Sequence, residues 1–315
     1  RTSDGMLRQI KRVTRFWKAY AGSKLITAIG DKELRDYVLW RRDYYTKRPN
    51  EASKRNVKVN PADKTIQFDI MIGKAVINWA HEQKLRGLLP LPTFTYTPKK
   101  KRVRPAFEMG DYRGVTHAIE QWIKACENPK YLHTRQLLLD YVVILGRSGM
   151  RVGEANNLKV RDVVRFVDGE NRINYRFVVR GKTGERDVIP VVSVVPSVKR
   201  VLASKGESPD PDAWFFAMPG GTKVISLADQ FDKVLKQSRR KMSSSDEPFS
   251  LYSLRHFYAV MALRSGVGIY DVARNMGTSV DMIQQYYGKN ATAASMATKL
   301  GGKLKPKHEL DTSAE

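Results

Sequence analysis

The chain has 315 residues, 42% of them hydrophobic, which is enough to build two domains with their own cores. It carries 56 Lys and Arg residues against 32 Asp and Glu residues, a net charge of +24. This excess predicts a polyanionic partner, and nucleic acid is the commonest one because neutralising its phosphates releases condensed counterions. No apolar stretch approaches the roughly 18 residues of a membrane-spanning helix, so a membrane is not the expected partner.

Two further features bear on the compartment. Cys126 is the single cysteine, which excludes an internal disulfide and is typical of a reducing compartment. We therefore expect a cytoplasmic protein. The sequence begins at Arg1 and not at methionine, which is typical of a processed or shortened chain.

The first 97 residues are predicted to form a small helical domain. Apolar residues recur at helical spacing after Asp31, which is expected to cap a helix, and again from Thr65 to Lys84. Arg41 and Arg42 lie on the first of these helices, and we expect them to contact DNA. For any one of these charges, an ordinary solvated helix face is the alternative interpretation.

A basic segment between two prolines marks the predicted domain boundary. Residues 98–105 read PKKKRVRP, and the prolines prevent a continuous helix. We expect this linker to be a cationic strap that crosses a DNA backbone, and a nuclear import signal is the alternative. Its cations are Lys99, Lys100, Lys101, Arg102 and Arg104.

The second predicted domain spans residues 106–290. A helix from His133 to Gly146 is apolar on nearly every side, which predicts deep burial. Gly149 then permits a tight turn, and a short helix from Val152 to Leu158 follows it. Arg151 is therefore expected to stand on rigid support against the core.

The pattern next changes to that of strands. Apolar and polar residues alternate from Ile173 to Val179, and the segment from Asp187 to Val192 is predicted to pair with that strand. Residues 181–184, Gly-Lys-Thr-Gly, would close the hairpin. Lys182 at its tip is either a solvated turn lysine or a proton donor that reaches into a groove.

Two more helical segments complete the domain. Ser250–Val260 places Arg255 among apolar neighbours, where a guanidinium needs a carboxylate or a phosphate as its partner. Met276–Lys289, with Ser279 as its expected cap, carries two adjacent tyrosines. Taken together, the elements predict a mainly α protein with a small antiparallel β-sheet (α+β).

Four motifs in this order resemble the tyrosine recombinase family, which includes phage integrases of the lambda integrase type. They read SGMRVGE (148–154), GKTGERDVIP (181–190), YSLRH (252–256) and MGTSVDMIQQYYG (276–288). The resemblance implies a helical core DNA-binding domain over 1–97 and a catalytic domain over 106–290. It implies catalytic functions for Arg151, Lys182, Tyr252, Arg255, Thr278 and Tyr287, with Glu154 and His256 in support.

Two positions depart from the family pattern. The family most often has histidine where this chain has Tyr252, and histidine or tryptophan where it has Thr278. Both replacements keep a hydroxyl that can bond a phosphate oxygen, but neither can carry a proton near neutral pH as imidazole does. Of the two adjacent tyrosines, the family spacing selects Tyr287 as the nucleophile and leaves Tyr286 as a flanking residue.

The resemblance also implies a reaction. The tyrosine hydroxyl attacks a DNA phosphate, while Arg151 and Arg255 neutralise the charge that gathers on the nonbridging oxygens. Lys182 would protonate the leaving 5′ oxygen, and the product would be a 3′-phosphotyrosine link. We expect neither a cofactor nor a metal, because the five histidines do not cluster at ligand spacing with each other, with the cysteine or with paired carboxylates.

The expected partners are double-stranded DNA recombination sites, a homotetramer assembled on them, and accessory DNA-bending or directionality proteins. The tail at 291–315 would dock on a neighbouring subunit, with a frayed terminus as the alternative. A type IB topoisomerase-like enzyme and a noncatalytic DNA-binding protein that retains the fold are the two rival interpretations. The target sequence does not follow from the chain, since base readout depends on which side chains reach the grooves.

Overall fold

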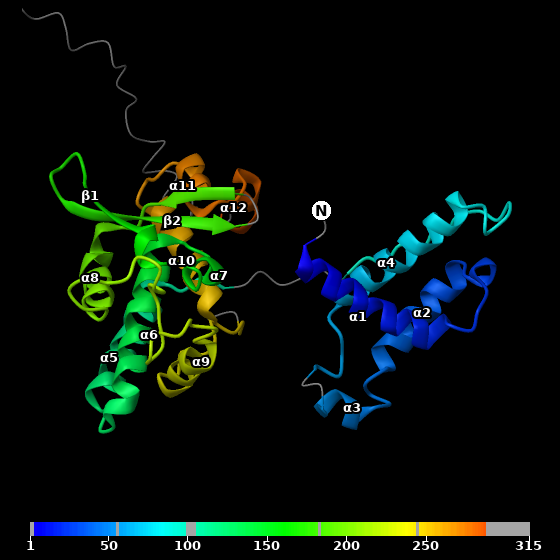
Figure 1. The fold of residues 1–315 in the computed structure, drawn as a ribbon, viewed down its shortest axis with the longest axis horizontal. Helices are drawn as coiled ribbons and strands as arrows, with labels where there is room; N and C mark the ends of the chain where they lie inside the picture. Colours follow the sequence, from blue (N-terminus) through cyan, green and yellow to red (C-terminus); the bar gives the residue numbers. More distant parts are fainter. Residues whose placement is uncertain (1–2, 55–56, 99–104, 182–183, 244–245, 288–315) are drawn as a thin grey trace, which may run out of the picture. The chain divides into compact units, whose positions relative to one another are not determined.

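The computed structural model describes residues 3–54, 57–98, 105–181, 184–243 and 246–287. The chain divides into two compact units, Arg1–Arg102 (unit 1) and Val103–Glu315 (unit 2). The described residues are mainly helical with one small antiparallel sheet, which confirms the predicted fold class (Figure 1). No helix in these ranges has the length and apolar character needed to cross a membrane.

The regular secondary structure in the described part of unit 1 is all helical. Its elements are α1 (Asp4–Ala21), a 3-10 turn η1 (Ile26–Ala28), α2 (Asp31–Asp43), α3 (Pro49–Lys54) and α4 (Asp63–Glu82). Aromatic rings hold α1 against α2, since Trp17 and Tyr37 stack with centroids 4.0 Å apart. Gly73 of α4 permits this arrangement, because a Cβ there would come within 2.3 Å of the Trp17 ring. The apolar core therefore lies between α1, α2 and α4.

The expected capping function of Asp31 is wrong. The residue before α2 is Gly30, whose backbone N–H donates to the Glu33 carboxylate at 3.0 Å. Asp31 instead accepts from the backbone N–H of Phe94 and from the hydroxyl of Thr93, both at 2.9 Å, and these bonds lower the pKa of its carboxyl. Asp31 thus attaches the end of unit 1 to α2, an interaction 63 residues along the chain that helical spacing does not reveal.

Unit 2 combines helices with one sheet. Its helices are α5 (Met109–Lys124), α6 (Pro129–Ser148), α7 (Val152–Ala155), α8 (Val195–Ala203), α9 (Ala228–Gln237), α10 (Leu251–Arg264), α11 (Ile269–Met276) and α12 (Val280–Tyr287). Its strands are β1 (Val163–Val167), β2 (Ile173–Gly181) and β3 (Gly184–Val188), with short 3-10 turns η2 (Val160–Asp162) and η3 (Val192–Val194).

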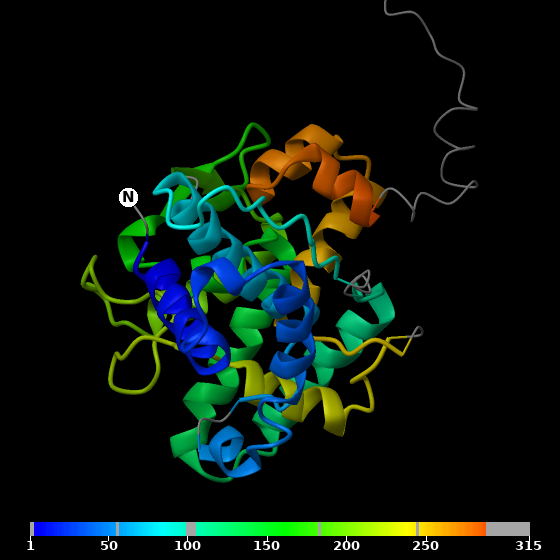
Figure 2. The same cartoon turned by 90° about the vertical axis from the view of Figure 1, so that its right-hand side faces the viewer.

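Helix α6 is the central element of unit 2. It is longer than predicted, because the Asn128 side chain caps its first turn and Pro129 occupies its first position. Leu138, Tyr141 and Val142 have no exposed surface, which confirms the predicted deep burial. The sheet, α11 and α12 lie at the end of unit 2 where α6 terminates, and the α5–α6 turn lies at the other end (Figures 1 and 2). The carboxyl end of α6 is therefore where distant segments meet.

The sheet has the strand order β1-β2-β3, and both pairings are antiparallel. The prediction placed the third strand at 187–192, but β3 runs from Gly184 to Val188. The strand ends there because Pro190 has no N–H to donate and because the N–H of Ile189 bonds the side chain of Asn275 at 2.7 Å. Strand β1 was not predicted.

Candidate active site

The site begins at the turn after α6. Gly149 has φ of +67° and caps the helix in the left-handed region, as its sequence position predicted. A Cβ at this position would lie 2.3 Å from the ring of Tyr258. Both the positive φ and the lack of room for a side chain therefore require glycine here. Its carbonyl accepts a 2.6 Å hydrogen bond from Nη1 of Arg255, and Arg151 follows two residues later as the N-cap of α7. One turn therefore connects the two predicted arginines.

Arg255 comes from the buried face of α10 and is only 4% exposed. Burial and, after it, the positive charge of Arg151 lower the pKa of its guanidinium to about 10. Arg255 is therefore still ionised at neutral pH. Because Arg255 bonds the Gly149 carbonyl and Arg151 lies two residues further along the chain, the same turn holds both arginines.

Glu154 is the anion of the site. Its carboxylate is 6% exposed and accepts from Nη1 of Arg151 at 2.7 Å and from the Arg151 backbone N–H at 2.9 Å. Burial by itself would raise its pKa, but the hydrogen bonds from Arg186 and Arg151 outweigh burial and lower it to about 2. Glu154 thus stays ionised and holds Arg151 in place.

Arg186 is a member of the site that the sequence analysis missed. Its guanidinium binds both Glu154 oxygens, Nη1 to Oε1 at 2.9 Å and Nη2 to Oε2 at 3.0 Å. It also donates to the carbonyls of Asn275 at 3.3 Å and Met276 at 3.0 Å. The alternation of side chains along a strand could have revealed it. Arg186 lies opposite the buried Val179 in the sheet, so its side chain lies on the same, inner face.

Asn275 connects the same region from α11. Its side-chain amide donates to the carbonyls of Ser148 and Ile189 and to the hydroxyl of Tyr258, the last at 2.7 Å. The ends of α6, β3 and α11 are therefore tied to α10 by one side chain. Sequence analysis did not single out this residue, because its partners are distant along the chain.

The turn between α11 and α12 lies against the two arginines. Gly277 has φ of +61°, and the N–H of Thr278 bonds the carbonyl of Ala273 at 3.0 Å, which ends α11 in a Schellman motif. Nη2 of Arg151 donates to the Gly277 carbonyl. Ser279 caps α12 as predicted, since its hydroxyl accepts from the Met282 N–H at 3.2 Å. Helix α12, which ends at Tyr287, therefore starts beside Arg151.

Tyr252 and His256 lie one turn apart on α10, with ring centroids 5.1 Å apart in an edge-to-face arrangement. Tyr252 is half-buried, and His256 is buried. Lys182 lies outside the described residues. Its neighbour Gly181 is close to the site, because a Cβ there would lie 3.7 Å from Oε1 of Glu154.

The cations predicted to bind DNA differ in their exposure and in whether the structure describes them. Arg42 is exposed and donates to Asp63 at 3.0 Å and to the Tyr96 hydroxyl at 2.8 Å. Arg41, by contrast, is not an exposed cation, because its side chain is 3% exposed and Nε binds Asp69 at 3.0 Å inside unit 1. The linker cations Lys99, Lys100, Lys101, Arg102 and Arg104 all lie outside the described residues.

Within the described ranges, no three side chains of the His, Cys, Asp or Glu type come together in a way that could hold a metal ion. The arrangement is one of paired guanidiniums, a single buried carboxylate and backbone carbonyls. Such a set can bind a phosphate group, because planar guanidinium donors match the geometry of phosphate oxygens.

Comparison with known structures supports the fold. The Tn1549 transposon integrase in complex with circular intermediate DNA has a TM-score of 0.64 and 18% identity, over 95% of this chain and 94% of that one. A lambda integrase dimer bound to a COC′ core site has a TM-score of 0.63 and 15% identity, over 98% and 76%. XerH recombinase on a palindromic difH substrate has a TM-score of 0.62 and 14% identity, over 94% and 80%.

Sequence comparisons give two results. A search of curated proteins finds no match to the chain. The family model described as the phage integrase family matches residues 115–293, a range that holds all four motifs and more than half of the chain. The chain belongs to the phage integrase family, the family of the tyrosine-type site-specific DNA recombinases.

Proposed function

We propose that this chain cleaves and rejoins DNA at specific sites through a covalent 3′-phosphotyrosine intermediate. One observation carries the proposal: Arg151 and Arg255 are both attached to the Gly149–Arg151 turn, and the same Arg151 binds the turn from which α12 starts. Two cations of fixed geometry and the helix that ends at Tyr287 thus belong to one assembly. Preorganised charge of this kind is usually the largest contribution to phosphoryl-transfer catalysis.

The proposed first step is a transesterification. The phenol oxygen of Tyr287 forms a bond to phosphorus, the bond from phosphorus to the 5′ oxygen breaks, and the phenol proton is lost. Lys182 supplies the proton that the 5′ oxygen takes up. Arg151 and Arg255 stabilise the negative charge on the two nonbridging oxygens, and the hydroxyls of Tyr252 and Thr278 hydrogen-bond to the phosphate.

The second step reverses the first with another DNA end. A free 5′ hydroxyl attacks the phosphotyrosine, a phosphodiester forms and the tyrosine is released. Because one phosphodiester is exchanged for another of similar energy, neither step needs an external energy source. Glu154 contributes by holding Arg151, and His256 contributes by packing within α10.

The surrounding parts of the chain have proposed functions of their own. Residues 1–97 form a core DNA-binding domain, residues 106–290 the catalytic domain, and the linker at 98–105 crosses the DNA backbone between them. Four copies assemble on paired sites, and residues 291–315 dock on a neighbouring subunit. A solved lambda integrase tetramer is bound to a Holliday junction, which supports this arrangement. The protein would act in the cytoplasm on a nucleoid or a mobile element, with accessory DNA-bending or directionality proteins.

A trapping assay tests the chemistry. The protein is incubated with a cognate DNA that carries a nick next to the scissile phosphate, so that the cleaved strand diffuses away. We expect a covalent adduct that resists denaturation with the unaltered chain and with Tyr286→Phe, and no adduct with Tyr287→Phe, because that variant lacks the attacking oxygen. Peptide mapping of the adduct should place the phosphate on Tyr287.

The same assay separates the alternatives. An adduct lost in Tyr286→Phe and retained in Tyr287→Phe would move the nucleophile by one residue. Relaxation of a supercoiled plasmid that lacks paired sites would support a topoisomerase-like enzyme. Binding without an adduct on any cognate site would support a noncatalytic DNA-binding protein.

A further inference from the structure

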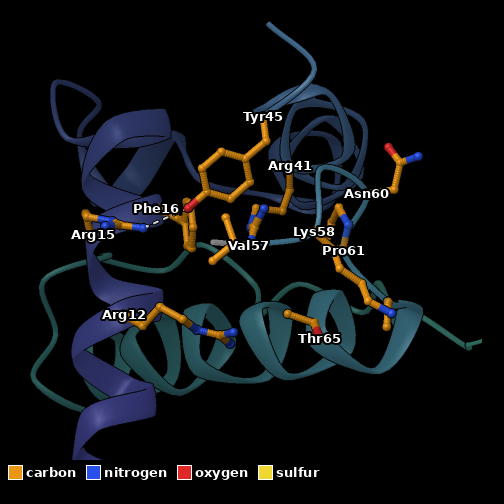
Figure 3. Close-up of a pocket in the computed structure, with 11 residues that line it drawn as sticks. Arg12, Arg15, Phe16, Arg41, Tyr45, Val57, Lys58, Asn60, Pro61 and Thr65 are labelled. Carbon is orange, nitrogen blue, oxygen red and sulfur yellow. Dashed lines mark hydrogen bonds between the residues drawn. The ribbon is translucent and has the colours of Figure 1, made fainter. Parts of the chain in front are cut away.

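Unit 1 contains a basic hollow that is separate from the residues of the candidate active site. Its volume is about 500 Å³, and cations from three parts of the unit line it: Arg12 and Arg15 of α1, Arg41 of α2, and Lys58 from the segment before α4. Figure 3 shows the three guanidiniums extending toward this space. We call these four cations and the space between them the arginine pocket.

Arg41 carries the inference, because it is buried and incompletely bonded. Its side chain is 3% exposed, and its Nε donates to Asp69 at 3.0 Å. Its Nη1 is fully buried and has no hydrogen-bond partner among the residues that the structure describes. A buried cationic N–H without an acceptor is costly, so this group is expected to bind an acceptor from outside the chain.

The rest of the pocket holds Arg41 rigidly. Its guanidinium carbon lies 3.6 Å from the centroid of the Phe16 ring, a cation–π contact, and Phe16 itself is buried. Arg15 donates to the hydroxyl of Tyr45 at 3.2 Å, and the Nε of Arg15 is a second buried donor without a partner in the described part of the chain. Two adjacent guanidiniums therefore present unused donors from fixed positions.

The charges of the pocket do not balance. Asp69 accepts from Arg41 and, at 3.4 Å, from Arg12, so one carboxylate faces two guanidiniums. None of the described residues that line the pocket is acidic. Arg15 and Lys58 add two more positive charges, so the pocket has an excess of cation that an external anion would neutralise.

We propose that the arginine pocket binds a phosphate group. Phosphate offers several oxygens in tetrahedral arrangement, which can accept from Arg41 Nη1 and Arg15 Nε at the same time, and guanidinium forks suit it better than they suit a single carboxylate. A second basic hollow, lined by Arg8, Arg12 and Lys64, shares Arg12 and Thr65 with the arginine pocket. The ligand therefore has room to continue beyond one phosphate, as a pyrophosphate or a DNA backbone does.

The experiment uses the full chain and inorganic pyrophosphate. Titration calorimetry in low salt measures the affinity, and thermal unfolding measures the stabilisation that a bound ligand confers. Arg15→Gln and Lys58→Ala are the test variants, since both remove a pocket cation without removing the Arg41–Asp69 pair. We expect each to weaken pyrophosphate binding at least about tenfold and to reduce the ligand-induced rise in Tm.

Lys11→Ala is the matched control, because Lys11 is an exposed cation on α1 that lines neither hollow. It should bind pyrophosphate like the unaltered chain. A crystal soaked in tungstate should show the tetrahedral anion within hydrogen-bond distance of Arg41 Nη1. Equal losses in Arg15→Gln and Lys11→Ala, or a tungstate site that excludes Arg41, would overturn the proposal.

A competition arm identifies the source of the phosphate. If the pocket holds a DNA backbone phosphate, pyrophosphate should displace a duplex from the unaltered chain and lose that effect in Arg15→Gln. If the pocket holds a free phosphate compound, pyrophosphate should bind equally well in the presence of saturating duplex. Because neither arm measures DNA cleavage, its outcome is independent of the phosphotyrosine assay.

Discussion

Glu154 shows how one carboxylate can determine the geometry of a cationic site. It is almost completely buried, yet bonds from Arg151 and Arg186 keep it ionised and lower its pKa to about 2. A buried anion is tolerated here because two guanidiniums surround it and satisfy its oxygens. Removing the charge of Glu154 would therefore affect the position of Arg151, and with it the binding of a phosphate.

The depressed pKa predicts how acid affects stability. Since the folded protein holds Glu154 ionised below the ordinary pKa of a glutamate, its contribution is complete above about pH 5 and disappears as the pH falls toward 2. The loss amounts to about 3 kcal/mol for a shift of this size. Denaturant unfolding from pH 6 to pH 2 should show a smaller loss for Glu154→Gln than for the unaltered chain.

Glu185→Gln is the matched control for this measurement, because Glu185 is an exposed glutamate on β3, next to Arg186. Its pH dependence should equal that of the unaltered chain. If the free energy of unfolding falls equally between pH 6 and pH 2 in Glu154→Gln and in the unaltered chain, Glu154 is not the cause of the loss.

Tyr252 is one of the two positions at which this chain departs from the family pattern. If its hydroxyl donates to the scissile phosphate, Tyr252→Phe should slow single-turnover cleavage about tenfold, as expected for one lost hydrogen bond to a charged group. Tyr252→His should retain activity, since imidazole supplies a donor at the same position. Full activity of Tyr252→Phe would remove the hydroxyl from the proposed mechanism.

At the scale of elements, the site forms where the ends of several elements meet. The end of α6, the start of α7, the strand β3 and the turn before α12 converge, and Arg186 bonds to three of their residues. Arg186 thus connects the sheet to α7 and to the end of α11. The connection holds β3 close to Glu154, the carboxylate that also binds Arg151.

Arg186 is therefore predicted to be a positioning residue. Arg186→Gln should slow single-turnover cleavage roughly ten- to a hundredfold, because small displacements of catalytic groups have effects of this size. The affinity for DNA should change little, and Arg186→Lys should restore activity only in part, since lysine cannot bond both Glu154 oxygens.

Arg176→Gln provides the control for Arg186. Arg176 is an exposed arginine on the neighbouring strand β2, and its side chain pairs with Asp187 at 2.9 Å. The control removes the same charge from the same sheet and should cleave normally. If Arg186→Gln and Arg176→Gln cleave DNA at the same single-turnover rate, Arg186 is not a positioning residue.

At the scale of the whole molecule, the net charge of +24 predicts a strong dependence of DNA binding on salt. A protein that neutralises six to ten phosphates loses about 10³ to 10⁵ in affinity between 50 and 200 mM salt. The five linker cations are expected to supply part of this effect. Replacing all five with glutamine should lower the slope of log K against log salt by up to about 4.5. An unchanged slope would place the linker away from the DNA backbone.

The sequence by itself determined the class of fold, the partner and the candidate chemistry. Local signals were sufficient for these: helical spacing in α6, glycine at the left-handed cap Gly149, and the order of four motifs. These features depend on neighbours within a few residues, so the linear sequence contains them in full.

Only the tertiary structure decided which charged groups face one another. Arg41 reaches Asp69 across 28 residues of chain, Arg186 reaches Met276 across 90, and Asn275 reaches Ser148 across 127. No local pattern distinguishes such an arginine from a solvated one, because burial and pairing depend on which surfaces pack together. The same reason explains why the arginine pocket, built from three separate segments, was not visible before the fold was known.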